Sequence, residues 1–363
     1  MTRHLLAAAC IAALAACSAD TNARADTTAP TQADTAPATG TPTRTIALPA
    51  ADGRPFVTEE VAQFKEPWAM SFLPDGRLLV TEKPGTLKLF DPASGRGSDI
   101  SGVPEVAYGG QGGLGDVVLH PGYADNGLVY ISYAEAGDGG AGGVVARARL
   151  RIDGDGGELQ DLAVIWRQVP KVSGQGHYAY RIAFDGDGML WITSGERQKF
   201  DPSQDMASNL GKVIRLHDDG SVPADNPFAD QGGVAAQVWS LGHRNPLGLA
   251  FDADGRLWVH EMGPKNGDEL NLIEAGNNYG WPYLTSGTDY SGAPVGVGTE
   301  KEGMTSAVHH FEETLAPSGL AFYSGDLFPE WEGHMLNGAL QGRALVRVVL
   351  DGREVVGEEW MLR

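Results

Sequence analysis

Cysteine is almost absent from this chain: only Cys10 and Cys17 occur among 363 residues, both near the amino terminus. The part of the chain that follows Cys17 therefore contains no disulfide and must be stable without one. Positive charge is also scarce, because 27 Lys and Arg residues stand against 47 Asp and Glu, for a net charge of −20. This balance argues against nucleic acid as a partner and against electrostatic binding to an anionic membrane surface.

Long apolar runs are missing as well. The run at residues 5–13 is too short to span a bilayer, and it follows the basic start of the chain as the core of a secretory signal does. It ends in Leu14-Ala15-Ala16-Cys17, which resembles the lipobox of bacterial lipoproteins, where the cysteine becomes the lipidated first residue. The alternative is an ordinary Ala-x-Ala cleavage site. The sequence thus predicts a lipoprotein signal peptide at 1–17 and an exported, periplasmic protein. Ser18 favours anchoring to the outer membrane.

Residues 18–52 are rich in Ala, Thr, Pro and Asp and contain almost no large apolar side chain. Such a segment cannot bury enough surface to fold, so we expect a disordered tether. The folded domain is then expected at residues 53–363.

Helix signals are few in this domain, whereas the chain's 50 glycines indicate many tight turns. One pattern recurs in this domain: an apolar pair, then a turn, then a β-branched or aromatic run. It is found at residues 70–80, 117–131, 182–192, 249–259 and, in degenerate form, 320–323. The Asp-Gly turns are typical of β-hairpins. Those at 153–156, 185–188 and 252–255 carry aspartates two apart, as calcium loops do, but they lack the later glutamate of an EF-hand. A repeated all-β unit predicts a β-propeller with one four-stranded blade per unit.

Only five such units are visible, and the chain stops after one more strand-like run at residues 345–350. Either the protein is a five-bladed ring, or it is a larger propeller that lacks its last blade.

Two clusters of candidate site residues lie before residue 200. Gln111 stands within Gly109-Gly110-Gln111-Gly112-Gly113, where glycines let the backbone approach a flat ligand, although a plain glycine loop is the alternative. His177 precedes the hairpin 182–193 and Glu196 follows it, so both ends of the hairpin can lie on one rim. Glu196 can then orient His177 as a general base. Capping or packing for the histidine, and a surface salt bridge for the glutamate, are the alternatives.

Two further clusters follow. Arg244 and Asn245 offer a fork-shaped cation for a carboxylate or quinone oxygen beside an amide. The carbonyls near Gly263 and Pro264, followed by Glu269 and Tyr279, are hard oxygen donors of the kind that calcium prefers. No Rossmann glycine motif, Gly-x-Ser-x-Gly elbow or His-Glu-x-x-His zinc motif is present.

Taken in order, these clusters resemble the soluble pyrroloquinoline-quinone (PQQ)-dependent sugar dehydrogenases, the family of aldose sugar, glucose and sorbosone dehydrogenases. The resemblance covers roughly residues 61–350. The matching positions are Gly-Gln-Gly-Gly-Leu at 110–114, His177 four residues before Arg181, the acid after Ser194-Gly195, Arg244-Asn245-Pro246, Gly263-Pro264, Gly-Asp-Glu-Leu-Asn at 267–271, and Asn-Tyr-Gly-Trp-Pro at 278–282.

The resemblance implies a six-bladed β-propeller that carries the quinone in a cleft on one face. It implies oxidation of aldose sugars or sugar aldehydes at the anomeric carbon, with hydride transfer to the quinone. An unidentified quinone or cytochrome would then accept the electrons.

Roles for individual residues also follow from the resemblance. His177 would be the base, oriented by Glu196. The cofactor would be held by Gln111, Arg244 and Asn245, with Tyr290 as a weaker candidate. The carbonyls of Gly263 and Pro264 would bind the calcium that also chelates the quinone, and Glu269 and the Tyr279 carbonyl would form a second, structural calcium site.

The chain departs from the family pattern in two places. Gln341 follows Ala339-Leu340, where the family usually has a lysine. The chain also ends at Arg363, before the closing blade of the family, so we expect the last blade to be absent. Two other functions stay open: a non-catalytic propeller that binds a sugar or protein ligand, and a calcium-dependent lactone hydrolase.

Overall fold

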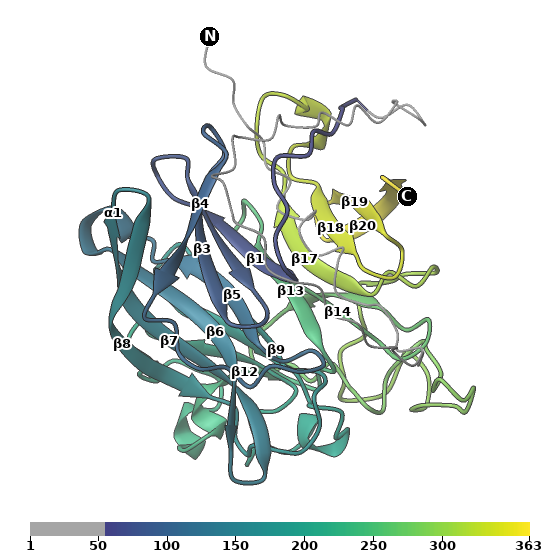
Figure 1. The fold of residues 1–363 in the computed structure, drawn as a ribbon. Helices are drawn as coiled ribbons and strands as arrows, with labels where there is room; N and C mark the ends of the chain where they lie inside the picture. Colours follow the sequence, from purple (N-terminus) through teal and green to yellow (C-terminus); the bar gives the residue numbers. More distant parts are fainter. Residues whose placement is uncertain (1–54) are drawn as a thin grey trace, which may run out of the picture.

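The computed structural model describes residues 55–363, so the predicted signal peptide and tether lie outside the described residues. The regular secondary structure of the described part is almost entirely β-strand, which confirms the all-β prediction (Figure 1). Its strands form five consecutive antiparallel units of four strands each, arranged in the order of the sequence. No helix within residues 55–363 has the length and apolar character needed to cross a membrane.

The first two units are joined into one eight-stranded sheet. The first contains β1 (Pro67–Phe72), β2 (Leu78–Glu82), β3 (Thr86–Asp91) and β4 (Arg96–Ser101). The second contains β5 (Leu114–Leu119), β6 (Leu128–Gly137), β7 (Gly140–Asp153) and β8 (Gly156–Arg167), with the short helix α1 (Tyr123–Asn126) before β6. A short parallel pairing of β4 with β8 makes the junction, which the repeat pattern did not predict.

The other three units are separate four-stranded sheets. They contain β9 (Ala179–Phe184), β10 (Leu190–Ser194), β11 (Lys212–Leu216) and β12 (Val238–Leu241); β13 (Pro246–Phe251), β14 (Leu257–Glu261), β15 (Glu269–Ile273) and β16 (His309–His310); and β17 (Pro317–Phe322), β18 (Met335–Ala339), β19 (Ala344–Asp351) and β20 (Glu354–Met361). Single 3-10 turns lie at Asp201–Ser203, Ala229–Gln231, Ala235–Gln237 and Pro329–Trp331. The expected strand at 345–350 is β19, whereas β20 was missed.

The hairpin turns follow from aspartate chemistry, as predicted. In the turn between β13 and β14, Asp252 Oδ1 accepts the backbone N–H groups of Asp254 and Arg256, and Oδ2 accepts Trp258 Nε1–H at 2.9 Å. In the turn between β9 and β10, Asp185 likewise accepts Trp191 Nε1–H at 2.8 Å. The carboxylate oxygens in these two turns therefore bind their own hairpins, which favours hairpin turns over calcium loops.

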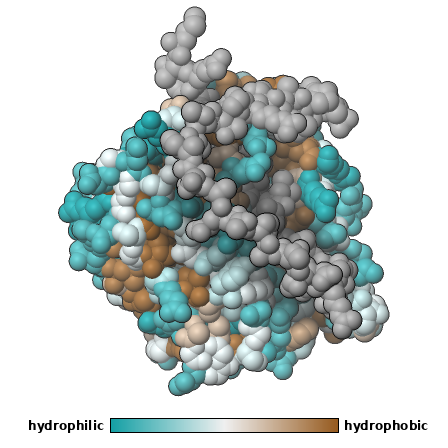
Figure 2. All heavy atoms as spheres, in the orientation of Figure 1, coloured by the Kyte–Doolittle hydropathy of each residue, from teal (hydrophilic) through white to brown (hydrophobic). Residues whose placement is uncertain are grey.

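The apolar core lies between successive units, where neighbouring sheets pack face to face. Fully buried members include Leu79, Ile131, Ile192, Val259 and Val346, one from each unit. The innermost strands β1, β5, β9, β13 and β17 together line a central cavity of about 170 Å³. On the surface, Figure 2 shows apolar patches scattered among hydrophilic residues on the face it draws.

One side chain in this cavity joins all five units. The guanidinium of Arg181 on β9 lies 3.9 Å from the centre of the Trp68 ring on β1. Arg181 also donates to the carbonyls of Leu247 at 2.7 Å and Ser318 at 3.3 Å, on β13 and β17. Its remaining contact is Asp116 on β5, at 3.5 Å.

Residues 55–66 contain no strand, and their side chains contact the first and fifth units. The ring of Phe56 lies 5.9 Å from that of Trp331, while Phe64 lies 5.5 Å from Phe90. The pairing partners of β19 are β18 and β20, so this segment does not extend the fifth sheet. The blade number of the whole propeller stays a prediction.

Candidate active site

The hairpin β9–β10 brings His177 and Glu196 together, as the sequence predicted. Ser194 pairs with Ala179, so the residues just outside the hairpin meet at one rim. Glu196 Oε1 forms a short hydrogen bond with His177 Nδ1, and both side chains are buried. Glu196 is thus no surface salt bridge.

The environment sets the protonation of this pair. Burial lowers the pKa of His177, the hydrogen bond that His177 donates to Glu196 opposes this effect, and the charge of Arg244 adds to the lowering. Burial alone would raise the pKa of Glu196, but the hydrogen bond with His177 and two backbone N–H groups outweigh burial and lower it. One of these N–H groups is that of Phe200, 2.6 Å from Oε2. The arrangement therefore favours a neutral imidazole beside an ionised carboxylate near neutral pH.

Gln111 reaches the same place from the glycine loop. Its side-chain Oε1 accepts the backbone N–H of His177 at 2.7 Å. The loop needs glycine at position 110, where φ is +56° and a Cβ atom would lie 2.7 Å from the Gln175 carbonyl oxygen. Lys83 Nζ holds the Gly110 carbonyl at 2.9 Å.

Arg244 and Asn245 join this cluster through the backbone, because Glu196 N–H donates to the Arg244 carbonyl at 2.9 Å. Arg244 Nη1 donates to the Met262 carbonyl at 2.7 Å, and the guanidinium lies 5.2 Å from the centre of the Trp281 ring. Arg244, Asn245 and Trp281 are all buried. Arg244 Nε, Asn245 Oδ1 and Trp281 Nε1 nevertheless have no hydrogen-bond partner within residues 55–363. Buried polar atoms without partners are costly, so this group fits a polar ligand that supplies them.

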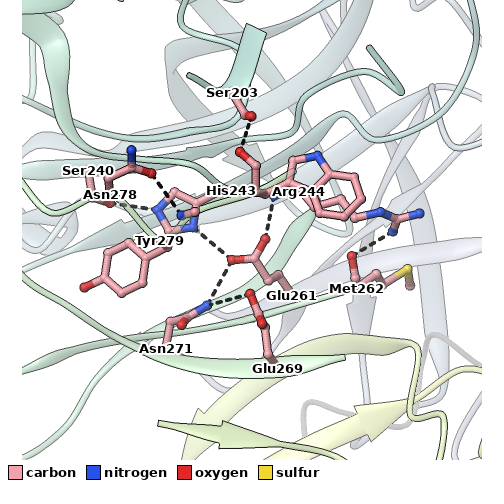
Figure 3. Close-up of polar contacts among 12 residues, drawn as sticks. Ser203, Ser240, His243, Arg244, Glu261, Met262, Glu269, Asn271, Asn278 and Tyr279 are labelled. Carbon is pink, nitrogen blue, oxygen red and sulfur yellow. Dashed lines mark hydrogen bonds and ion pairs between the residues drawn. The ribbon is translucent and has the colours of Figure 1, made fainter. Parts of the chain in front are cut away.

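A second buried network supports Arg244 from below (Figure 3). Glu261 Oε2 accepts the backbone N–H of Arg244 at 2.6 Å, and Oε1 contacts His243 Nδ1 at 2.9 Å and Asn271 Nδ2 at 3.0 Å. His243 Nε2 lies 2.8 Å from Ser240 Oγ. No role for His243 or Glu261 was predicted from the sequence. The only signal was their position, His243 in the loop before Arg244 and Glu261 at the end of β14, two residues before Gly263.

The candidate calcium ligands surround this network. Burial, with the charge of Glu261, raises the pKa of Glu269 well above its usual range, so this carboxylate fits a site that a cation neutralises. The Tyr279 ring stacks on His243 with centroids 4.9 Å apart, and Asn271 Nδ2 lies 3.5 Å from Glu269 Oε1. Both candidates therefore contact the group centred on Glu261.

Gly263 and Pro264 form a tight loop. The Pro264 carbonyl accepts Gly267 N–H at 3.0 Å, and a Cβ at Gly263 would lie 1.8 Å from the Gly267 carbonyl oxygen. Asp268 fixes the loop by accepting Gly263 N–H at 3.0 Å. Among the described residues, no three His, Cys, Asp or Glu side chains are grouped to hold a metal ion, so a calcium here depends on backbone carbonyls.

Tyr290 lies apart. Its side chain is 73% exposed, and no hydrogen bond or ring contact in the described part of the chain joins it to His177 or Arg244. Its assignment to the cofactor stays a prediction.

Comparison with known proteins identifies the family of the chain. The sequence model of the glucose/sorbosone dehydrogenase family matches residues 64–363. The aldose sugar dehydrogenase YliI of Escherichia coli (strain K12) is 40% identical over 305 residues, which cover 82% of this chain and 82% of that protein.

Two solved structures are similar in fold. A glucose dehydrogenase structure superposes with a TM-score of 0.79 at 43% identity, covering 82% of this chain and 87% of the other. The PQQ-bound form of aldose sugar dehydrogenase from Streptomyces coelicolor superposes with a TM-score of 0.71 at 31% identity, covering 84% and 83%. This chain therefore belongs to the glucose/sorbosone dehydrogenase family and is an oxidoreductase of the sugar dehydrogenase class.

Proposed function

We propose that this protein oxidises aldose sugars, or sugar aldehydes, at the anomeric carbon with PQQ and calcium as cofactors. The observation that carries the proposal is the buried His177–Glu196 pair. It is joined through the Arg244 carbonyl to polar atoms that lack hydrogen-bond partners among residues 55–363. The family membership and the PQQ-bound relative support the same reaction.

His177 is the proposed base. With the Glu196 carboxylate on Nδ1, the ring carries its proton there, and Nε2 is left to take the proton of the anomeric hydroxyl. The lowered pKa of His177 keeps the ring neutral and able to accept that proton near pH 7. Glu196 then stabilises the imidazolium that forms.

Arg244, Asn245 and Gln111 are the proposed quinone-binding residues, with Tyr290 as an additional candidate. Arg244 Nε can donate to a carboxylate or quinone oxygen, and Asn245 Oδ1 and the Gln111 amide offer further polar contacts. The Gly263 and Pro264 carbonyls are the proposed ligands of a calcium beside the quinone, and Glu269 with the Tyr279 carbonyl those of a second calcium. When bound, the quinone supplies the hydride acceptor and the calcium polarises its carbonyl.

Dye reduction tests the proposal. Purified protein mixed with PQQ and calcium should reduce an electron-acceptor dye in the presence of aldoses, and omission of PQQ should abolish the signal. The variant His177→Ala should lose at least about 100-fold in kcat, as expected on loss of a general base. No dye reduction with any aldose or sugar aldehyde by a well-folded, PQQ-loaded protein would contradict the proposal. Turnover of lactones without the quinone would point to the hydrolase instead.

Three further parts of the proposal concern the whole protein. We propose a six-bladed propeller, of which the described units supply five. We also propose export with a lipid anchor on Cys17. The electron acceptor would then be a periplasmic or membrane quinone or cytochrome.

A further inference from the structure

We propose that Phe200, stacked on Trp281, forms an apolar platform for one face of the sugar ring beside His177. This inference rests on the proposed function, because it assigns the subsite that holds the substrate of that reaction. Phe200 is 43% exposed, so one face of its ring is accessible to a ligand. Its ring centroid lies 5.3 Å from that of Trp281 at an interplanar angle of 28°, so a flat apolar surface faces outward.

The loop that presents Phe200 is held in an uncommon conformation. Arg197, Gln198 and Phe200 have φ values of +59°, +58° and +63°, in the left-handed region that bulky residues rarely adopt. The buried Arg197 guanidinium fixes the loop by donating to three backbone carbonyls at 2.6 to 2.9 Å. The Phe200 N–H donates to Glu196 Oε2 at 2.6 Å. The platform is therefore built on the same carboxylate that orients His177, and strain of this kind is often kept where function needs it.

Hydrogen-bond donors lie at the edge of the platform. Trp281 Nε1 and Arg244 Nε are buried and have no acceptor within the described part of the chain. The Arg244 guanidinium lies 5.2 Å from the Trp281 ring centre, so the donors and the apolar surface belong to one group. A sugar ring combines an apolar C–H face with hydroxyl groups around its edge. It can cover the Phe200 ring and offer a hydroxyl oxygen to Trp281 Nε1, while Arg244 Nε is the proposed donor to the quinone. Ligands bind in this way in pockets of mixed aromatic and polar lining.

Substitution of Phe200 tests the platform. Phe200→Ala removes the surface, and Phe200→Trp keeps a flat ring. The matched control is Phe72→Ala, because Phe72 is 41% exposed at the carboxyl end of β1 and contacts none of these residues. Each variant is first compared with wild type by circular dichroism. KM and kcat are then measured for an aldose panel, PQQ affinity by titration, and sugar binding by Trp fluorescence in the protein without PQQ.

We expect Phe200→Ala to raise KM for aldoses about 5- to 10-fold, in line with the loss of one aromatic contact. The value of kcat and the PQQ affinity should stay within about twofold, Phe200→Trp should restore KM, and Phe72→Ala should change nothing. Weaker PQQ binding with unchanged KM would overturn the platform and assign Phe200 to the cofactor. Unchanged constants throughout would reduce it to a packing residue.

The fluorescence titration separates this inference from the proposed function. If wild-type protein binds aldoses but reduces no dye, and Phe200→Ala loses that binding, the platform stands and the dehydrogenase proposal fails. If dye reduction is robust and Phe200→Ala matches wild type in KM and binding, the platform fails alone. If wild type neither binds nor oxidises any sugar, both are overturned.

Discussion

Replacing Glu196 by glutamine should disable the base while keeping the shape of the site. Glu196 Oε2 accepts the backbone N–H groups of Lys199 and Phe200, so the carbonyl oxygen of the new side chain should stay there. Its NH2 group then faces His177 Nδ1, which must accept a hydrogen bond and pass its proton to Nε2, the atom that should receive the substrate's proton. The lost charge-assisted hydrogen bond is worth about 1.5–3 kcal/mol, so kcat/KM should fall about 10- to 150-fold.

The pH dependence of kcat/KM gives a second, independent test of the Glu196→Gln variant. Glu196 opposes the burial that lowers the pKa of His177, so its removal should lower that pKa further. The acidic limb of kcat/KM should therefore move to lower pH even as the plateau falls.

The assay is dye reduction across pH at saturating PQQ and calcium, with ¹⁵N NMR of the histidine ring to report which nitrogen carries the proton. The control is Glu358→Gln, which removes another His–Glu pair, His309 Nε2 to Glu358 Oε1 at 2.5 Å, outside the proposed site. If Glu196→Gln keeps kcat/KM within twofold of wild type with an unmoved acidic limb, the assignment of His177 and Glu196 is wrong.

Three other changes have defined outcomes. Burial and the charge of Glu261 raise the pKa of Glu269, so calcium should bind more tightly as pH rises and should raise the melting temperature of the protein. The variant Glu269→Gln should weaken both effects. Equal stabilisation of variant and wild type by calcium would contradict the site. Lys212 is fully buried and donates to the carbonyls of Pro202, Ser203 and Leu210. The variant Lys212→Met should therefore lower the free energy of unfolding, measured in urea, by about 3 kcal/mol. An unchanged value would mean that the loop 202–210 is stable without these three hydrogen bonds. The variant Cys17→Ala should be found free in the periplasmic fraction, and recovery of wild type there with an unmodified thiol would refute lipidation.

The fold could be predicted where the determinants are local. Asp185 and Asp252 close their hairpins through their own side chains and turn backbones, so residues adjacent in sequence carry the signal. The repeat of such hairpins was enough for an all-β architecture. The parallel pairing of β4 with β8 depends on how the first two units meet in space, and no sequence pattern in either strand predicts it. The strand β20 lacks an Asp-Gly-x-Leu-Trp pattern, and it was missed.

The site was predictable to the same extent. His177 and Glu196 flank one hairpin, so their meeting follows from strand pairing alone. Which oxygen of Glu261 faces which donor depends on side-chain packing between β12, β13, β14 and β15, and the sequence cannot supply it. The stacking of Phe200 on Trp281 joins loops 81 residues apart, by the difference of their numbers, so its basis is wholly tertiary.

The contacts of Arg181 affect how this molecule can come apart. In a linear repeat protein each unit touches only its neighbours, so the ends can fray while the middle stays folded. Here one guanidinium on β9 contacts Trp68, Asp116, Leu247 and Ser318, one residue from each of the other units. Detaching any one sheet removes a partner from a partly buried cation that the remaining sheets share. Partial unfolding therefore costs a contact of Arg181 whichever sheet detaches first. Arg181 thus helps to hold together the sheets that carry His177 and Arg244, although it is not itself a proposed site residue.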